Sequence, residues 1–172
     1  MQLQIEHLPN LKVLNFYVPK VLSKKTLLLT PDSSDNPEFM RNIFDSFDGE
    51  HCLVTPEVFA FKYKNESEID ELRALIMAEL EDFFEAPENL DNLQGKDDTF
   101  ALAQAVADSF IRPTLNRDKG DIELVSLTDG VLIVKFTGHC AGCPFAQNTL
   151  NNVIVKALCR LIPQIKEVRL EE

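Results

Sequence analysis

Apolar residues recur at intervals of three and four along residues 69–84, the spacing of one buried helix face. The set is Ile69, Leu72, Leu75, Ile76, Leu80, Phe83 and Phe84. A shorter helical pattern covers residues 39–47. Strands are expected at residues 11–18, 53–54 and 58–63. The pattern predicts a small α+β domain at residues 1–86.

The second half of the chain predicts the order helix, strand, strand, loop, helix, strand. These elements are expected at residues 99–111, 122–127, 131–136, 137–144, 145–161 and 167–170, in that order. Asp98 or Thr99 is suited to cap the first helix, and Pro113 to bend or end it. Asp129-Gly130 between the first two strands is typical of a tight hairpin turn. A second α+β domain is predicted at residues 99–172.

Residues 87–98 are polar, acidic and interrupted by proline and glycine. This composition is typical of an exposed segment between domains. The sequence therefore predicts two small α+β domains joined by an acidic linker.

The charge of the chain narrows the range of partners. Its formal net charge is -11, which argues against a protein that neutralises nucleic-acid phosphates with clustered Lys and Arg. No stretch approaches the length of a membrane span. Neither nucleic acid nor a membrane is therefore an expected partner, the first because of the charge and the second because of this length. The start of the chain shows no export or transit signal, and the simplest expectation is a cytoplasmic protein.

The chain has four cysteines, Cys52, Cys140, Cys143 and Cys159. In a reducing compartment, a close pair indicates metal binding or redox chemistry before a structural disulfide. Cys140 and Cys143 are the one such pair, and their two-residue separation lets both sulfurs bind one metal centre.

The neighbours of this pair favour a soft metal centre. Gly138 and Gly142 permit backbone turns that direct amide N–H groups at an anionic cluster. Pro144 suits the first turn of the next helix, whose positive end would favour thiolates. Thiolates select iron–sulfur clusters, zinc or cuprous copper over hard cations.

The number of ligands in this loop predicts dimerisation. An iron–sulfur cluster ordinarily takes four cysteine ligands, and the loop offers two. A second copy of the chain, related by a two-fold axis, would supply the others. Such a shared cluster is labile, which suits a carrier better than a permanent electron-transfer centre.

Two other functions compete for the same pair. A thiol-disulfide oxidoreductase also uses two cysteines at this spacing, although a hairpin precedes the loop and Pro144 follows the second cysteine. A zinc-stabilised binding module would need a dimer or His139 to complete four ligands. No nucleophile is paired with a base, so an ordinary enzyme is not expected.

The remaining candidate residues have structural interpretations. Cys52 and Cys159 are expected to be small core residues, because neither has a partner at ligand spacing. His139 is expected to be a solvated loop residue. Three acidic residues nearby are expected in turns and on the surface, namely Asp118, Asp121 and Glu123.

The second half resembles the carboxy-terminal scaffold domain of the NifU-like (Nfu-type) iron–sulfur cluster proteins. The matching residues are Ile111-Arg112-Pro113, Leu115, Asp118, Gly120-Asp121-Ile122-Glu123-Leu124, Asp129-Gly130-Val131, Gly138, Cys140, Gly142-Cys143-Pro144, Ile162-Pro163 and Val168. Residues 9–12 and 39–61 look like a degenerate amino-terminal domain of the same family. Lys119 departs from the family, which often has glycine there, and so does His139 beside the first cysteine.

This resemblance implies a scaffold or carrier that binds a [4Fe-4S] cluster between two chains. Cys140 and Cys143 would be the ligands in each chain. The implied partners are apo iron–sulfur proteins as clients, an upstream cluster assembly machinery, and a second copy of the chain in a homodimer formed on cluster binding.

Overall fold

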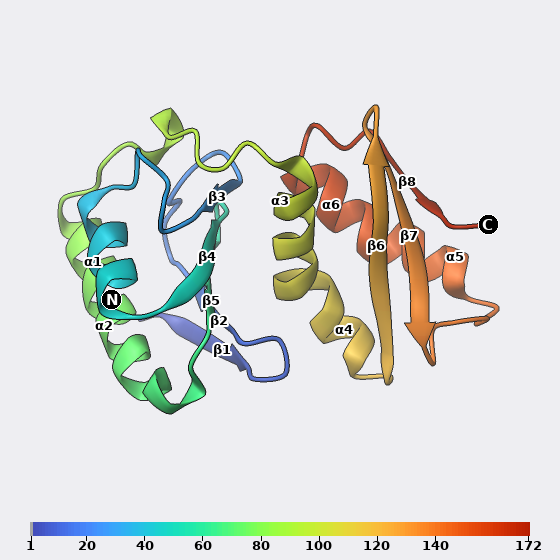
Figure 1. The fold of residues 1–172 in the computed structure, drawn as a ribbon, viewed down its shortest axis with the longest axis horizontal. Helices are drawn as coiled ribbons and strands as arrows, with labels where there is room; N and C mark the ends of the chain where they lie inside the picture. The colour runs from blue at the N-terminus through green and yellow to red at the C-terminus, as the bar shows by residue number, and fades with distance from the viewer. Residues whose placement is uncertain (1) are drawn as a thin grey trace. The chain divides into compact units, whose positions relative to one another are not determined.

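The computed structural model describes residues 2–172, and the chain divides into two compact units between Asp97 and Asp98. Each unit combines helices with one β-sheet (Figure 1). The predicted α+β class is therefore confirmed.

The sheet of the first unit has five strands, all paired antiparallel in the order β1-β2-β5-β4-β3. The strands are β1 Gln4–Leu8, β2 Val13–Tyr17, β3 Leu27–Leu29, β4 Gly49–Val54 and β5 Val58–Tyr63. Strands β1 and β3 were not predicted. Both are edge strands, and β3 has only three residues, too few for an alternating pattern.

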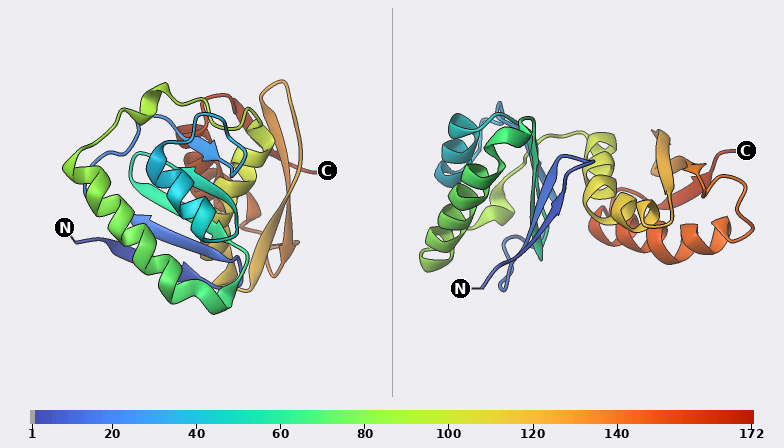
Figure 2. Two further views of the ribbon diagram at one scale, coloured as in Figure 1. Left: turned by 60° about the vertical axis from the view of Figure 1, so that its left-hand side comes forward. Right: turned by 90° about the horizontal axis from the view of Figure 1, so that it is seen from below.

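Helices α1 (Glu38–Ser46) and α2 (Ile69–Glu85) cover one face of this sheet (Figure 2). Both lie within a residue or two of their predicted bounds. A single 3-10 turn, η1 (Glu66–Glu68), leads into α2. The core between helices and sheet buries Phe16, Phe59, Phe61, Met40, Ile43, Ile76 and Leu80. Burial of this apolar surface is the main favourable term for the unit.

The segment predicted to be an exposed linker is largely exposed, but it is attached to the first unit. Leu90, in the 3-10 turn η2 (Leu90–Asn92), is 2% exposed and belongs to the core of that unit. Asp91 Oδ1 accepts hydrogen bonds from the Lys24 amide at 2.6 Å and from Ser23 Oγ at 3.1 Å. The Lys96 amide donates to the Leu28 carbonyl at 2.7 Å. The composition thus predicted the exposure of most of these residues but not the attachment, which rests on Leu90 and on hydrogen bonds to distant residues.

Replacing Leu90 with alanine tests this attachment. The change should lower the free energy of unfolding by about 2 to 4 kcal/mol, because it removes a buried side chain from a packed core. Chemical denaturation would measure the loss. Glu88→Ala, at an exposed position of the same segment, should be nearly neutral. Equal and small effects of both variants would contradict the packing.

The second unit begins with a helical stretch of three parts. Helix α3 (Thr99–Val106) is capped by Asp98, whose Oδ1 accepts from the Ala101 amide at 2.9 Å. A π-helical segment, η3 (Ala107–Ile111), and α4 (Arg112–Asn116) follow. Pro113 lies in the first turn of α4. Because proline lacks an N–H, it suits the start of a new helical turn after the wider π-helical one.

The sheet of the second unit has the order β6-β7-β8. Strands β6 (Gly120–Thr128) and β7 (Val131–Gly138) form the predicted hairpin, and β8 (Glu167–Leu170) pairs parallel to β7. Asp129 and Gly130 both have positive φ, as the favoured two-residue hairpin turn requires.

The predicted helix at residues 145–161 is confirmed with two differences. It starts at Ala146, so Pro144 precedes it rather than lying in its first turn. It also widens: α5 (Ala146–Thr149) continues through the π-helical η4 (Leu150–Val155) into α6 (Lys156–Leu161). The buried residues of this stretch are Leu150, Ile154, Leu158 and Leu161. The buried sheet residues of the unit are Ile122, Leu124, Leu132, Val134, Phe136 and Val168.

Candidate functional site

Cys140 and Cys143 lie on the loop that leaves strand β7 and enters α5 (Figure 1). The loop is built from consecutive turns. The Ala141 amide donates to the Gly138 carbonyl at 3.1 Å, the Cys143 amide to the Cys140 carbonyl at 3.3 Å, and the Ala146 amide to the Cys143 carbonyl at 3.1 Å. Both thiols are free and partly buried. The loop therefore presents two sulfurs on a folded backbone that remains open to solvent.

Glycines fix the path of this loop. Gly138 and Gly142 have φ values of 61° and 70°, in the left-handed region that favours glycine. A Cβ atom on Gly138 would also lie 2.7 Å from the Lys119 carbonyl oxygen. Gly120, the antiparallel partner of Gly138, has no room for a Cβ, which would overlap Cys140 Sγ. The sulfur of Cys140 thus packs directly on the backbone at the start of β6.

Lys119 is one departure from the family pattern, and it lies in the turn before β6. Its φ is 59°, which side chains other than glycine seldom adopt. A glycine at this position would be unstrained, whereas lysine costs on the order of 1 kcal/mol. The carbonyl of Lys119 nevertheless accepts from the His139 amide at 3.1 Å, so the turn before β6 is still joined to the cysteine loop.

The electrostatics of Cys140 differ from the prediction. Burial raises the pKa of this thiol, and Cys143, Asp118 and Asp121 raise it further, although a hydrogen bond with the Asp121 backbone lowers it. Helix α5 begins three residues after Cys143, so both cysteines precede its first turn. Near neutral pH Cys140 therefore carries its proton, which a bound metal ion would displace.

An ion-pair network supports the strand beneath Cys140. Arg112 Nε lies 2.9 Å from Asp108 Oδ1, and its Nη1 donates to Asp121 Oδ1 at 2.8 Å and to the Ile122 carbonyl at 2.6 Å. Asp121 Oδ1 also accepts from the Ile122 amide at 2.8 Å. The prediction that Asp121 is merely a surface residue is therefore incomplete. Arg112 and Gly120 matched the family pattern, but no motif or spacing indicated a role for them at the cysteine loop.

Three other candidate residues, Cys52, Cys159 and His139, have no contact with the paired thiols that would make them ligands in the described structure. Cys52 is fully buried in the core of the first unit, as expected, and burial raises the pKa of its thiol. Cys159 was expected in the core but is only partly buried in α6. The His139 side chain is exposed, as expected of a loop histidine.

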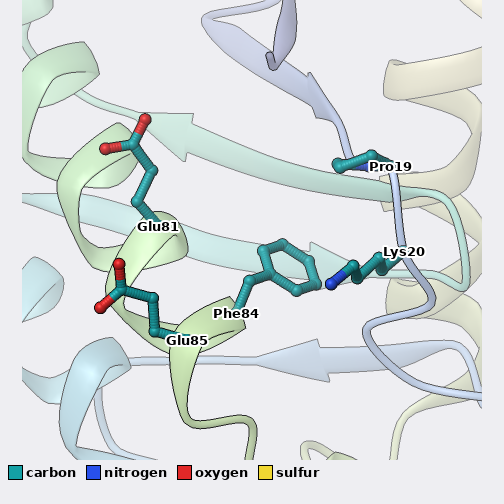
Figure 3. A pocket seen from close by; sticks show the side chains of 5 residues that line it. All are labelled: Pro19, Lys20, Glu81, Phe84 and Glu85. Atoms are coloured by element: carbon teal, nitrogen blue, oxygen red, sulfur yellow. The ribbon is translucent and has the colours of Figure 1, made fainter. Parts of the chain in front are cut away.

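Among residues 2–172, no three His, Cys, Asp or Glu side chains are grouped so that they could hold a metal ion. A pocket in the first unit is lined by Pro19, Lys20, Glu81, Phe84 and Glu85 (Figure 3). Lys20 and Phe84 point toward one another there, while the Glu81 carboxylate points away. This pocket contains no soft ligand.

Comparisons with known proteins identify the family. Residues 104–169 match the model of the NifU-like domain. The human protein named NFU1 iron-sulfur cluster scaffold homolog, mitochondrial, is 29% identical over 181 residues, which cover 98% of this chain and 71% of the human one. The chain is a NifU-like protein of the Nfu type.

Relatives of the same name occur in Drosophila grimshawi and Drosophila persimilis. They are 33% and 32% identical over 122 and 121 residues. These alignments cover 70% and 69% of this chain but only 38% and 39% of the Drosophila proteins. The NifU-like chain thus spans well under half of these relatives.

The predicted cytoplasmic location is wrong in the light of these relatives, which are all named as mitochondrial proteins. The described part of the NifU-like chain has no helix that is long and apolar enough to cross a membrane.

Proposed function

We propose that this NifU-like protein is an iron–sulfur cluster scaffold and carrier, rather than an enzyme. Cys140 and Cys143 of two copies would bind one [4Fe-4S] cluster, which is then transferred to apo-proteins. The observation that carries the proposal is the cysteine loop itself, with two free, partly buried thiols held on consecutive turns. The family membership and the names of the relatives support the scaffold role.

Ligand number supports a shared site. The loop supplies two thiols, and a cluster of this type ordinarily takes four. A two-fold axis beside the loop would bring the same two thiols from a second copy. Phe145 follows Pro144 and is 66% exposed, the highest value among the exposed large apolar side chains of the described residues. Apolar surface beside the ligands is suited to burial against a second copy.

Release of the cluster follows from the same arrangement. Both ligand pairs lie on loops rather than inside a core, so separation of the copies would withdraw half of the ligands at once. The raised pKa of the Cys140 thiol also favours return of its proton when iron leaves. A scaffold built in this way holds the cluster as cargo for apo-protein clients.

Anaerobic reconstitution with iron and sulfide tests the proposal. Mössbauer spectroscopy and native mass spectrometry should find one [4Fe-4S] cluster in a dimer of the wild type. Cys143→Ser should lose the cluster and the dimer. Cys159→Ser, which changes a partly buried cysteine on α6, should retain both. A cluster that survives in Cys143→Ser, or a wild-type chain that forms none, would contradict the proposed function.

A further inference from the structure

Three polar side chains meet at one end of the helix-covered face of the first sheet. His7 of β1 pairs with Leu14 of β2, and Leu14 pairs with Phe61 of β5. Because side chains alternate between the faces of a strand, Tyr63 lies on the same face as Phe61. Beyond Tyr63 the chain enters η1, whose first residue is Glu66. The sheet and the turn thus bring residues distant in sequence to one place.

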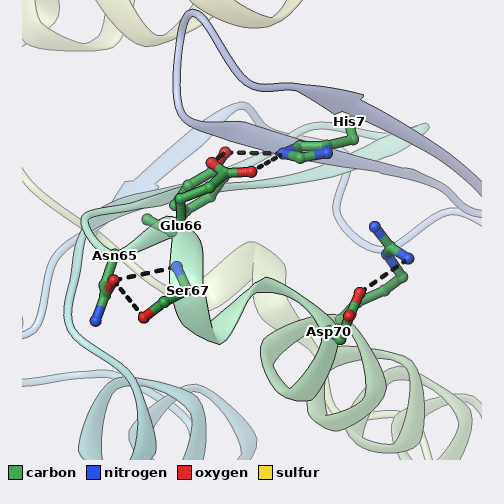
Figure 4. Close-up of polar contacts among 7 residues, drawn as sticks. His7, Asn65, Glu66, Ser67 and Asp70 are labelled. Atoms are coloured by element: carbon green, nitrogen blue, oxygen red, sulfur yellow. Dashed lines mark hydrogen bonds and ion pairs between the residues drawn. The ribbon is translucent and has the colours of Figure 1, made fainter.

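The turn that presents Glu66 is held in position. Asn65 Oδ1 accepts from the Ser67 amide at 3.1 Å and from Ser67 Oγ at 2.8 Å, which caps η1 (Figure 4). A side-chain cap of this kind fixes the first residues of a helical turn. The backbone of Glu66 is therefore fixed at the start of η1, within reach of His7.

The functional atoms of the three residues are mutual neighbours. His7 Nε2 lies 3.2 Å from Glu66 Oε1 (Figure 4). It also lies 2.8 Å from Tyr63 Oη, and the Tyr63 hydroxyl donates to Glu66 Oε2. Ligands bound to one transition metal at about 2.0 Å lie about 2.8 to 3.3 Å from each other in octahedral or tetrahedral geometry. The two distances to His7 Nε2 agree with this spacing, whereas the Tyr63–Glu66 contact is a closer hydrogen bond that would open when both oxygens bind one ion.

The exposure of the three side chains suits a site with open positions. Tyr63 is 1% exposed, so its phenol is fixed by the core. The side chains of His7 and Glu66 are 27% and 51% exposed, respectively. Ions from solvent can therefore reach the exposed side of His7 and Glu66. Water can fill the coordination positions that the three side chains leave open.

We propose that His7, Tyr63 and Glu66 form an iron site that binds ferric iron. Imidazole, phenolate and carboxylate are all ligands of iron in proteins. Two anionic oxygens on one ion favour a trivalent cation over a divalent one. On binding, the Tyr63 phenol releases its proton to solvent as the oxygen–iron bond forms, and no electron is transferred. This site uses no cysteine and is independent of the proposed cluster function.

Ferric citrate added to the full-length Cys140→Ser/Cys143→Ser variant tests the site, because this background removes the paired thiols. We expect one iron per chain after gel filtration and a visible phenolate-to-iron charge-transfer band. Tyr63→Phe should abolish the band. His7→Gln and Glu66→Gln should each weaken iron binding at least about tenfold, as loss of a ligand costs no less than loss of its supporting partner.

Tyr17→Phe is the matched control, since Tyr17 is the other of the two tyrosines. Its hydroxyl donates to Glu6 Oε1 at 3.2 Å, and this variant should keep the band. The proposal is rejected if no iron binds or if the band persists in Tyr63→Phe. Should Tyr63→Phe lose its native circular dichroism, His7→Gln decides, and an unchanged iron affinity in that variant rejects the site.

Discussion

Replacing Gly120 with alanine is expected to remove most of the cluster-binding capacity of the chain. A Cβ atom at this position would overlap Cys140 Sγ and would also lie 3.1 Å from Cys140 Cβ. The strand cannot easily yield, because Gly120 is held in the β6–β7 ladder opposite Gly138. The sulfur must therefore move. The variant should hold less than about a tenth of the wild-type iron, since displaced support around a ligand costs 10- to 100-fold in affinity.

Iron and sulfide content after anaerobic reconstitution would measure the effect of Gly120→Ala. Ser126→Ala is a suitable control, because Ser126 is an exposed residue of the same strand. It should reconstitute like the wild type. Full occupancy in Gly120→Ala would show that Cys140 does not act from the position seen here. Circular dichroism should confirm that both variants are folded.

Replacing Arg112 with alanine is expected to lower the free energy of unfolding of the second unit by about 2 to 3 kcal/mol. The Arg112 and Asp108 side chains are only 16% and 13% exposed, so removal of the guanidinium leaves a largely desolvated carboxylate without its cation. The expected loss of unfolding free energy is smaller than that for a fully buried ion pair, because Asp121 is 43% exposed. Arg112→Lys should recover only part of the loss, since one ammonium cannot reproduce the planar guanidinium contacts.

Arg169→Ala provides the comparison for Arg112. Arg169 contacts Glu167 at 2.6 Å, but the two side chains are 60% and 49% exposed. Its removal should cost less than about 1 kcal/mol. Urea denaturation of both variants would separate the two cases. Equal losses would contradict the assigned importance of the Arg112 network.

Local patterns predicted most of the fold. Helix α2 and the β6–β7 hairpin were found because their signals, a three-and-four apolar spacing and Asp129-Gly130, lie within a few consecutive residues. The attachment of residues 87–97 was missed because it depends on pairing with distant backbone groups, such as the Lys24 amide. Composition reports average polarity and does not reveal such partners.

The candidate site, like the fold, could be predicted from the sequence only where its signal is local. Cys140 and Cys143 could be singled out because their spacing is itself the signal. The packing of Cys140 on Gly120 and the contacts of Arg112 with two aspartates required the folded chain, since they join three elements. The direction of the Cys140 pKa was also missed, because it depends on burial and on the acidic side chains nearby.

Cys52 gives the first unit a built-in kinetic reporter. Its side chain has 0% exposure within the apolar core, whereas the other three thiols are all partly accessible. A thiol reagent should therefore modify three cysteines in the folded protein and the fourth only when the core opens. The rate of that fourth modification reports the opening rate of the unit when labelling is faster than closing, and its opening equilibrium when labelling is slower.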